Sequence, residues 1–250
     1  MKTIYQLQTK IKREDKIINF GIPDNPDEIE KMHRLRFNSY SYKGYIDPKL
    51  FPDGIEKDEY DKDEKCTYFI AKLDEKILGT VRLIKDEYLP TEKECFKFEE
   101  PEEMKNIPRE QRAELGRLII IPPDKDRNVY LPRNVIMLFL INTLVSWGLE
   151  NNILGGYAFI KEKLRIKLGK LKMPIHLIKD YVQIYPKNGI LYGYFSQEDD
   201  KVIPIFYFTE EFKNYIDKIV NKSLMFKKED NKFIIRENLY NKFLKILKII

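Results

Sequence analysis

The stretch Arg112-Ala-Glu-Leu-Gly-Arg-Leu-Ile-Ile-Ile-Pro-Pro123 decides the fold. Its four consecutive apolar residues, Leu118–Ile121, are rich in β-branched side chains, which is typical of a strand buried on both faces. The two prolines end the strand, because proline cannot donate a hydrogen bond to a neighbouring strand. Glu114 and Arg117 lie just before the apolar run, and charges in a protein interior are costly unless they are paired or functional. We therefore expect this strand, over about 115–121, to form the floor of an active site.

Helix and strand patterns alternate on both sides of this strand. Upstream, a helical spacing to about Tyr42 precedes two β-rich runs, 67–73 and 77–84, which predict a hairpin. Downstream, Pro132 suits the first turn of a helix that reaches Glu150 and is apolar on nearly every face, so this helix is buried. The other expected elements are a ragged arm or short helix at 1–14, strands at 16–21, 153–160, 175–184, 189–195 and 202–208, and helices at 161–170 and 209–220.

The order of these elements predicts one mixed α/β domain. A buried strand, a helix and another strand favour a right-handed crossover with parallel pairing, whereas the hairpin is antiparallel. We expect an N-terminal arm at 1–14, the domain at 15–210 and a helical C-terminal extension at 211–250. This extension would pack on the domain or on a second subunit, or would lie on an anionic membrane as a basic amphipathic helix.

Composition excludes several classes of protein. The 250 residues contain 45 basic and 40 acidic side chains, and a net charge of +5 is no argument for a nucleic-acid partner. No run of about 18 apolar residues occurs, and the first residues have no apolar core of the signal-peptide kind. Cys66 and Cys95 make neither a disulfide framework nor a metal site. We expect a cytoplasmic protein without a bound metal, and the composition sets no oligomeric state.

The common catalytic motifs are missing from the sequence. It contains no Walker loop, no G-x-G-x-x-G fingerprint, no zinc spacing and no serine in a nucleophile elbow. His33 and His176 are too isolated in sequence to suggest a metal or a Cys–His pair. Acid–base or binding chemistry on a mixed sheet remains.

Charged residues at intervals along the chain are candidates for that chemistry. Glu114 is either a general base or, with Arg117, an ion pair at the entry of the strand. A bulge near Gly116 would bring the two side chains to the same side. Arg36 and Arg82 are further arginines on expected regular elements, and they are either solvated or face the same cleft. Asp58 and Asp61 lie in the long polar segment 43–65, where they would pair with these arginines or form a solvated acidic turn.

In chain order, these residues resemble the signature of the acyl-homoserine-lactone synthases and, at least as closely, of the N-acyl amino acid synthases. Both families belong to the GNAT acyltransferase superfamily. The resemblance runs from about Lys16 to Phe208 and rests on Arg36, Tyr40, Tyr45, Asp58, Asp61, Gly79-Thr-Val-Arg82 and Glu114-Leu-Gly-Arg117. It implies a three-layer α-β-α fold with a mixed, V-splayed central sheet, and the C-terminal helical tail beyond 220 lies outside it. It also implies transfer of a fatty acyl group from a thioester to the amine of a small acceptor, with no tightly bound cofactor.

The resemblance assigns roles to particular positions. Glu114 matches the base, and the charged cluster that shapes the site matches Arg36, Asp58, Asp61, Arg82 and Arg117. The backbone at Leu118, Ile119 and Ile120 would bind the pantetheine arm of the donor, and the helix start at Leu131 and Arg133 its phosphate. For the acceptor and acyl pocket we select Tyr40, Tyr45, Phe139, Leu144 and Tyr157.

Departures from the signature bear on the substrates. Tyr40 and Tyr45 stand where lactone synthases usually carry Phe and Trp, and Gly116 replaces a usual Ser, so an amino acid is preferred over S-adenosylmethionine as acceptor. The loop 126–130 has no glycine, which suits the single phosphodiester of acyl carrier protein better than the pyrophosphate of coenzyme A. Lysines and arginines would offer this acidic partner a basic surface: Arg127, Arg133, Lys161, Lys163, Arg165, Lys167 and Lys170. A non-catalytic module that binds acyl groups or the carrier protein is the alternative from another class.

Overall fold

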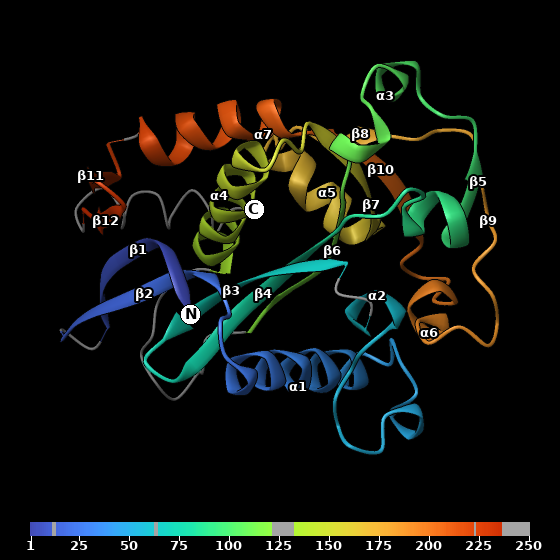
Figure 1. Cartoon of the computed structure of the whole chain (residues 1–250), viewed down its shortest axis with the longest axis horizontal. Helices are drawn as coiled ribbons and strands as arrows, with labels where there is room; N and C mark the ends of the chain where they lie inside the picture. The colour runs from blue at the N-terminus through green and yellow to red at the C-terminus, as the bar shows by residue number, and fades with distance from the viewer. Residues whose placement is uncertain (12–13, 63–64, 122–132, 223, 237–250) are drawn as a thin grey trace.

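Helices cover both faces of a seven-stranded mixed sheet in the computed structural model, which describes residues 1–11, 14–62, 65–121, 133–222 and 224–236 (Figure 1). The strand order is β11-β12-β1-β2-β3-β4-β6. A three-stranded sheet, β7-β10-β8, and a two-stranded one, β5-β9, complete the β structure of these residues. The strands are β1 (Lys2–Ile11), β2 (Glu14–Ile22), β3 (Cys66–Leu73), β4 (Lys76–Ile84), β5 (Phe96–Phe98), β6 (Glu114–Ile120), β7 (Gly155–Lys161), β8 (His176–Leu177), β9 (Tyr181–Gln183), β10 (Val202–Phe208), β11 (Phe226–Glu229) and β12 (Lys232–Ile235). The helices are α1 (Pro26–Tyr42), α2 (Glu59–Lys62), α3 (Glu102–Lys105), α4 (Arg133–Glu150), α5 (Glu162–Lys170), α6 (Tyr192–Phe195) and α7 (Thr209–Ile216), with short turns η1 (Pro48–Leu50), η2 (Thr91–Cys95), η3 (Arg109–Gln111) and η4 (Asp217–Asn221).

The alternation of side chains along β3 separates the two helical layers. Phe69 and Ala71 point to the side of α4 and belong to the largest buried cluster. Ile70 points to the other side and packs with Met32 of α1. Since successive strand residues face opposite sides, one strand serves both layers, and the mixed three-layer fold predicted from the sequence is confirmed.

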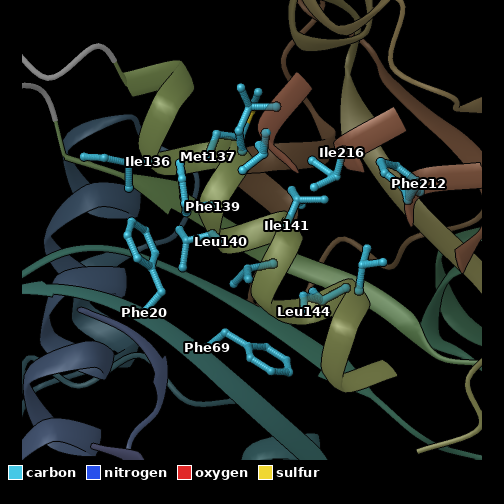
Figure 2. Packing of buried hydrophobic residues seen from close by; sticks show 14 of the residues in the cluster. Phe20, Phe69, Ile136, Met137, Phe139, Leu140, Ile141, Leu144, Phe212 and Ile216 are labelled. Carbon is cyan, nitrogen blue, oxygen red and sulfur yellow. The ribbon is translucent and has the colours of Figure 1, made fainter. Parts of the chain in front are cut away.

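Helix α4 is buried between the large sheet and α7, as its apolar surface predicted. Figure 2 shows its side chains between Phe20 and Phe69 of the sheet and Phe212 and Ile216 of α7. Phe139 lies at its centre, fully buried, 5.3 Å from the ring of Phe20. This packing holds α4 in place, and α4 forms one side of the site described below.

Strands β6 and β7 meet at one end and then separate. Ala113 N donates to Gly155 O (3.0 Å) and Leu154 N to Gln111 O (2.8 Å), and β7 then pairs with β10 over its whole length. At Gly156 a Cβ atom would lie 1.7 Å from the Ala113 carbonyl oxygen, so glycine is needed for this close approach. The result is the V-shaped splay that the family resemblance implied.

Several segments differ from the sequence predictions. Residues 1–14 were expected as a loose arm or short helix, but β1 is a full strand of the large sheet. The predicted strand 175–184 is broken into β8 and β9, and 189–195 contains the helical turn α6. Although it contains Pro204, β10 is not an edge strand, because it lies between β7 and the two-residue strand β8.

The C-terminal extension is not helical throughout. After α7 and η4, β11 and β12 form a hairpin that joins the large sheet beside β1. Residues 237–250, with the predicted amphipathic helix, lie outside the described part of the chain. Within the described residues, no helix is long and apolar enough to cross a membrane.

Candidate active site

A β-bulge in β6 aims the charged side chains of the site. Thr80 pairs with Ile119 and Arg82 with Gly116, so β6 holds one residue more than β4 over this interval. The bulged residue is Arg117, whose φ of 54° is left-handed. The bulge predicted near Gly116 is confirmed, and it falls on the next residue. Arg117 is held in this unfavourable conformation by its carboxylate partners.

Three arginines and three carboxylates form a closed ring in which each group bonds two of opposite charge. Arg36 of α1 donates to Glu56 and, at 2.8 and 3.0 Å, to Asp61. Arg82 of β4 donates to Asp61 (2.7 Å) and to Asp58 (2.7 and 2.8 Å). Arg117 closes the ring by donating to Asp58 (2.9 Å) and Glu56 (2.9 and 3.2 Å). The ring connects α1, strands β4 and β6, and the segment that precedes β3. Its formal charges cancel.

Burial makes the charges in this ring interdependent. Arg36 and Glu56 are fully buried, and Arg82 is 3% exposed. Burial alone would raise the pKa of Glu56, but Arg117 and Arg36 lower it to about 2. Arg36 and Arg82 likewise hold the pKa of Asp61 well below its usual range against the effect of burial. Glu56 and Asp61 therefore accept hydrogen bonds as anions, and removal of either would leave two buried guanidinium groups short of a partner.

Glu114 is the first residue of β6 and is 2% exposed. Its Oε2 accepts a hydrogen bond from the backbone N–H of Thr91 at 2.6 Å. Burial raises the pKa of Glu114 to about 8, although Thr91 and Arg82 act in the opposite direction. A carboxyl group with such a pKa is able to take up a proton near neutral pH, as a general base must.

A cavity of about 510 Å³ occupies the V between β6 and β7. One wall is β6 from Leu115 to Ile120, including the bulge, and the opposite wall is β7 from Ala158 to Lys161. Met137 and Ile141 of α4, with Leu168 of α5, Ile205 of β10 and Phe212 of α7, make part of the lining apolar. The size and lining suit a small ligand with an apolar part.

Aromatic rings line another part of the cavity. The ring centres of Tyr40 and Tyr45 are 5.8 Å apart, and those of Tyr45 and Tyr194 of α6 are 4.8 Å apart. The Arg117 guanidinium lies 5.6 Å from the centre of the Tyr40 ring, so the charged ring and the cavity meet at this residue. Lys161 Nζ lies beside both Tyr45 and Tyr194, and the residue is 5% exposed.

The structure brings most of the predicted site residues together. The five predicted members of the charged cluster are all in the ring, Tyr40 and Tyr45 line the cavity, and so do Leu118, Ile119 and Ile120. Glu114 lies at the foot of β6 and is not among the residues that line the cavity. Leu131 lies outside the described residues; Arg133 begins α4, but its side chain is outside them too.

Three pocket residues were predicted wrongly. Phe139 and Leu144 belong to the core between α4 and the sheet. Tyr157 packs with Phe98 and Met104 on the side of β7 away from the cavity. Helical spacing identified α4 as a wall but not which of its faces turns to the site, and that face carries Met137 and Ile141.

Glu56 and Lys161 were missed as members of the site. Glu56 stands in the acidic run with Asp58 and Asp61, but an irregular segment has no period that tells inward from outward side chains. Lys161 ends a buried strand, where a lysine is usually solvated. Its place after the apolar run Tyr157–Ile160 was the available signal. Among the described residues no cluster of His, Cys, Asp and Glu is arranged to hold a metal ion.

The splayed strands, the bulge and the cavity between them define a GNAT-like acyltransferase fold. A family model described as N-acyl amino acid synthase FeeM matches residues 31–145, which include the whole charged ring and Glu114. The match and the fold together identify the chain as an acyltransferase. A comparison with curated proteins finds no match.

Solved structures of low sequence identity share the fold. FeeM, an N-acyl amino acid synthase from uncultured soil microbes, is 17% identical, with a TM-score of 0.53 over 80% of this chain and 94% of FeeM. TofI, solved with an inhibitor and MTA, is 13% identical, with a TM-score of 0.56 over 80% of this chain and 96% of TofI. BjaI, a CoA-dependent acyl-homoserine lactone synthase solved with SAM and isopentyl-CoA, is 15% identical, with a TM-score of 0.50 over 86% of this chain and 89% of BjaI.

Proposed function

We propose that the chain is an N-acyltransferase that joins a fatty acyl group from a thioester to the amine of an amino acid. The observation that best supports this proposal is the cavity in the V, because its lining is partly apolar and it borders the charged ring at Arg117. The family model, described by an N-acyl amino acid synthase, supports this acceptor class.

The chemistry requires a neutral amine and a group that accepts its proton. The amine nitrogen attacks the thioester carbonyl and forms a C–N bond; the C–S bond then breaks, and the thiolate leaves and is protonated. We assign Glu114 as the base, and because it lies outside the cavity lining, the proton reaches it through a bridging water. The backbone of Leu118–Ile120, which lines the cavity, binds the donor arm in this proposal.

The preferred donor is acyl carrier protein, with acyl-CoA as the alternative. The glycine-free loop 126–130 supports the carrier protein, and the exposed Lys163 and Lys170 on α5 fit its acidic surface. BjaI, of similar fold, is a CoA-dependent enzyme with SAM as a ligand, so acyl-homoserine-lactone synthesis is the second candidate function. Tyr40 and Tyr45, in place of the Phe and Trp usual in lactone synthases, favour the amino acid.

Thiol release tests the proposal directly. Purified protein is mixed with acyl carrier protein or coenzyme A carrying acyl chains of several lengths, together with single amino acids or S-adenosylmethionine. We expect thiol release with an amino acid, and a product whose mass equals that of the fatty acid plus the amino acid minus water. Glu114→Gln is expected to lower the rate roughly 10²- to 10⁴-fold, as loss of a general base does, while donor binding stays intact.

The exposed Glu110→Gln is the matched control and should keep the wild-type rate. If the protein binds donors but releases thiol with no donor–acceptor pair, it is a non-catalytic acyl-binding module and not an enzyme. A lactone product from S-adenosylmethionine would select the second function.

A further inference from the structure

Lys161 is a buried cation in the candidate active site. It is the last residue of β7, lines the cavity and is 5% exposed. Its Nζ donates to the backbone carbonyls of Tyr194 and of Asp200, the latter at 2.8 Å. Within the described part of the chain it makes no ion pair with a carboxylate, whereas Arg117, also at the cavity, bonds both Glu56 and Asp58.

The surroundings hold this ammonium group in place. The backbone N–H of Tyr194 donates to Tyr45 O at 3.0 Å, which fixes both rings beside Nζ. Nζ lies 4.6 Å from the centre of the Tyr194 ring and 5.4 Å from that of Tyr45. A Cβ on Gly193 would lie 2.3 Å from Gly44 O, so glycine permits this contact between α6 and the segment after α1.

Neighbouring acids do not neutralise Lys161 directly. The Asp200 carboxylate accepts the backbone N–H of Lys163, and Asp199 pairs with the Lys163 ammonium. Burial lowers the pKa of Lys161, and Asp200 and Asp199 only oppose this effect. An ammonium has three N–H donors, and the described residues provide oxygen partners for two. A buried charge with a remaining donor at a cavity wall is completed by an anionic ligand.

We infer that Lys161 is the residue that selects the acceptor, by binding its carboxylate beside Tyr45 and Tyr194 at the cavity wall. This inference rests on the proposed function and makes it more specific. Because amine and carboxylate share one carbon in an α-amino acid, binding the carboxylate restricts the amine to the neighbouring part of the cavity, which β6 borders. Amines without a carboxylate then bind weakly.

Acceptors that differ only in the carboxylate test this assignment. Phenylalanine and phenylalaninamide are the probes, with decanoyl carrier protein and decanoyl-CoA as donors. For Lys161→Met, the KM for phenylalanine is expected to rise roughly 10- to 100-fold, the range for a charge-assisted bond. The KM for phenylalaninamide and the kcat for both should stay within about twofold. Lys161→Arg should restore part of the preference, and the exposed Lys179→Met should behave as wild type.

A binding measurement makes the test independent of turnover. Titration calorimetry compares N-decanoyl-phenylalanine with N-decanoyl-phenylalaninamide on wild type and variants, after circular dichroism has shown that each variant is folded. Wild type should prefer the carboxylate by the same 10- to 100-fold, and Lys161→Met should lose the preference. If Lys161→Met fails to fold, Lys161→Arg and the wild-type preference decide.

The outcomes separate the two proposals. Equal losses for both ligands would make Lys161 structural, and an equal fall in kcat for both acceptors would make it a base; either overturns the inference. Wild type without thiol release but with the carboxylate preference would remove the proposed function and leave the anion site. Wild type without the preference overturns the inference whatever the turnover.

Discussion

Glu114 shows how one buried side chain links activity to stability. The buried folded state raises its pKa to about 8 from an ordinary 4.5. Between these two values the folded protein holds a proton that the unfolded chain has lost, so the free energy of unfolding falls as pH rises through this window. The ionised form that a base needs is therefore gained at the expense of stability.

Replacement of Glu114 by glutamine should remove this pH dependence. Going from pH 4.5 to pH 8.5, the variant should gain on the order of 4–5 kcal/mol in unfolding free energy relative to wild type, because its amide never ionises. Denaturant titrations at both pH values measure the difference, and Glu110→Gln, with an exposed side chain, should show no such change. If variant and wild type differ in unfolding free energy by the same amount at both pH values, the pKa of Glu114 is not raised.

At the scale of elements, the charged ring fixes α1 and the segment 56–61 against β4 and β6. The resemblance to the family signature predicted five of its six members. Glu56 was not predictable, because an irregular segment does not indicate which acids turn inward. The bulge was predicted near Gly116 and falls on the next residue, Arg117, which its carboxylate partners hold in the left-handed region.

Glu56→Gln should weaken the attachment of α1 and the segment 56–61 to β4 and β6. Arg36 and Arg117 would each lose a charged partner, and we expect a loss of roughly 3–5 kcal/mol in unfolding free energy at pH 7. Since the folded pKa of Glu56 is about 2 against an ordinary 4.5, its contribution is complete above 4.5 and disappears as pH falls toward 2. The gap between variant and wild type should narrow over that range.

The control for the ring is Glu75→Gln. This side chain is 82% exposed and should change stability by no more than about 0.5 kcal/mol. A Glu56→Gln variant within 1 kcal/mol of wild type at pH 7 would show that the ring contributes little.

At the scale of the whole molecule, segments from both ends of the described chain complete the large sheet. Strand β1 was hidden in the sequence because its inward face, Tyr5, Leu7 and Thr9, includes only one aliphatic side chain. The sequence contains one indication of the β11–β12 hairpin: the turn residues Asp230-Asn231 lie between two short segments that carry apolar side chains. Basic residues around the turn obscured this pattern. Long periodic elements were predictable, whereas short strands depend on partners far away in sequence.

Phe233 of β12 tests whether this C-terminal hairpin belongs to the core. Its side chain is fully buried, 5.0 Å from the ring of Phe139 and 5.8 Å from that of Tyr5, and thus bridges β12, α4 and β1. Phe233→Ala should lower the unfolding free energy by roughly 3–5 kcal/mol through lost burial and a cavity. Leu224→Ala, at a side chain 71% exposed, should cost no more than about 0.5 kcal/mol. Urea titrations followed by tryptophan fluorescence measure both, since Trp147 of α4 packs against the same core. Equal, small effects of the two variants would mean that the sheet is complete without β12.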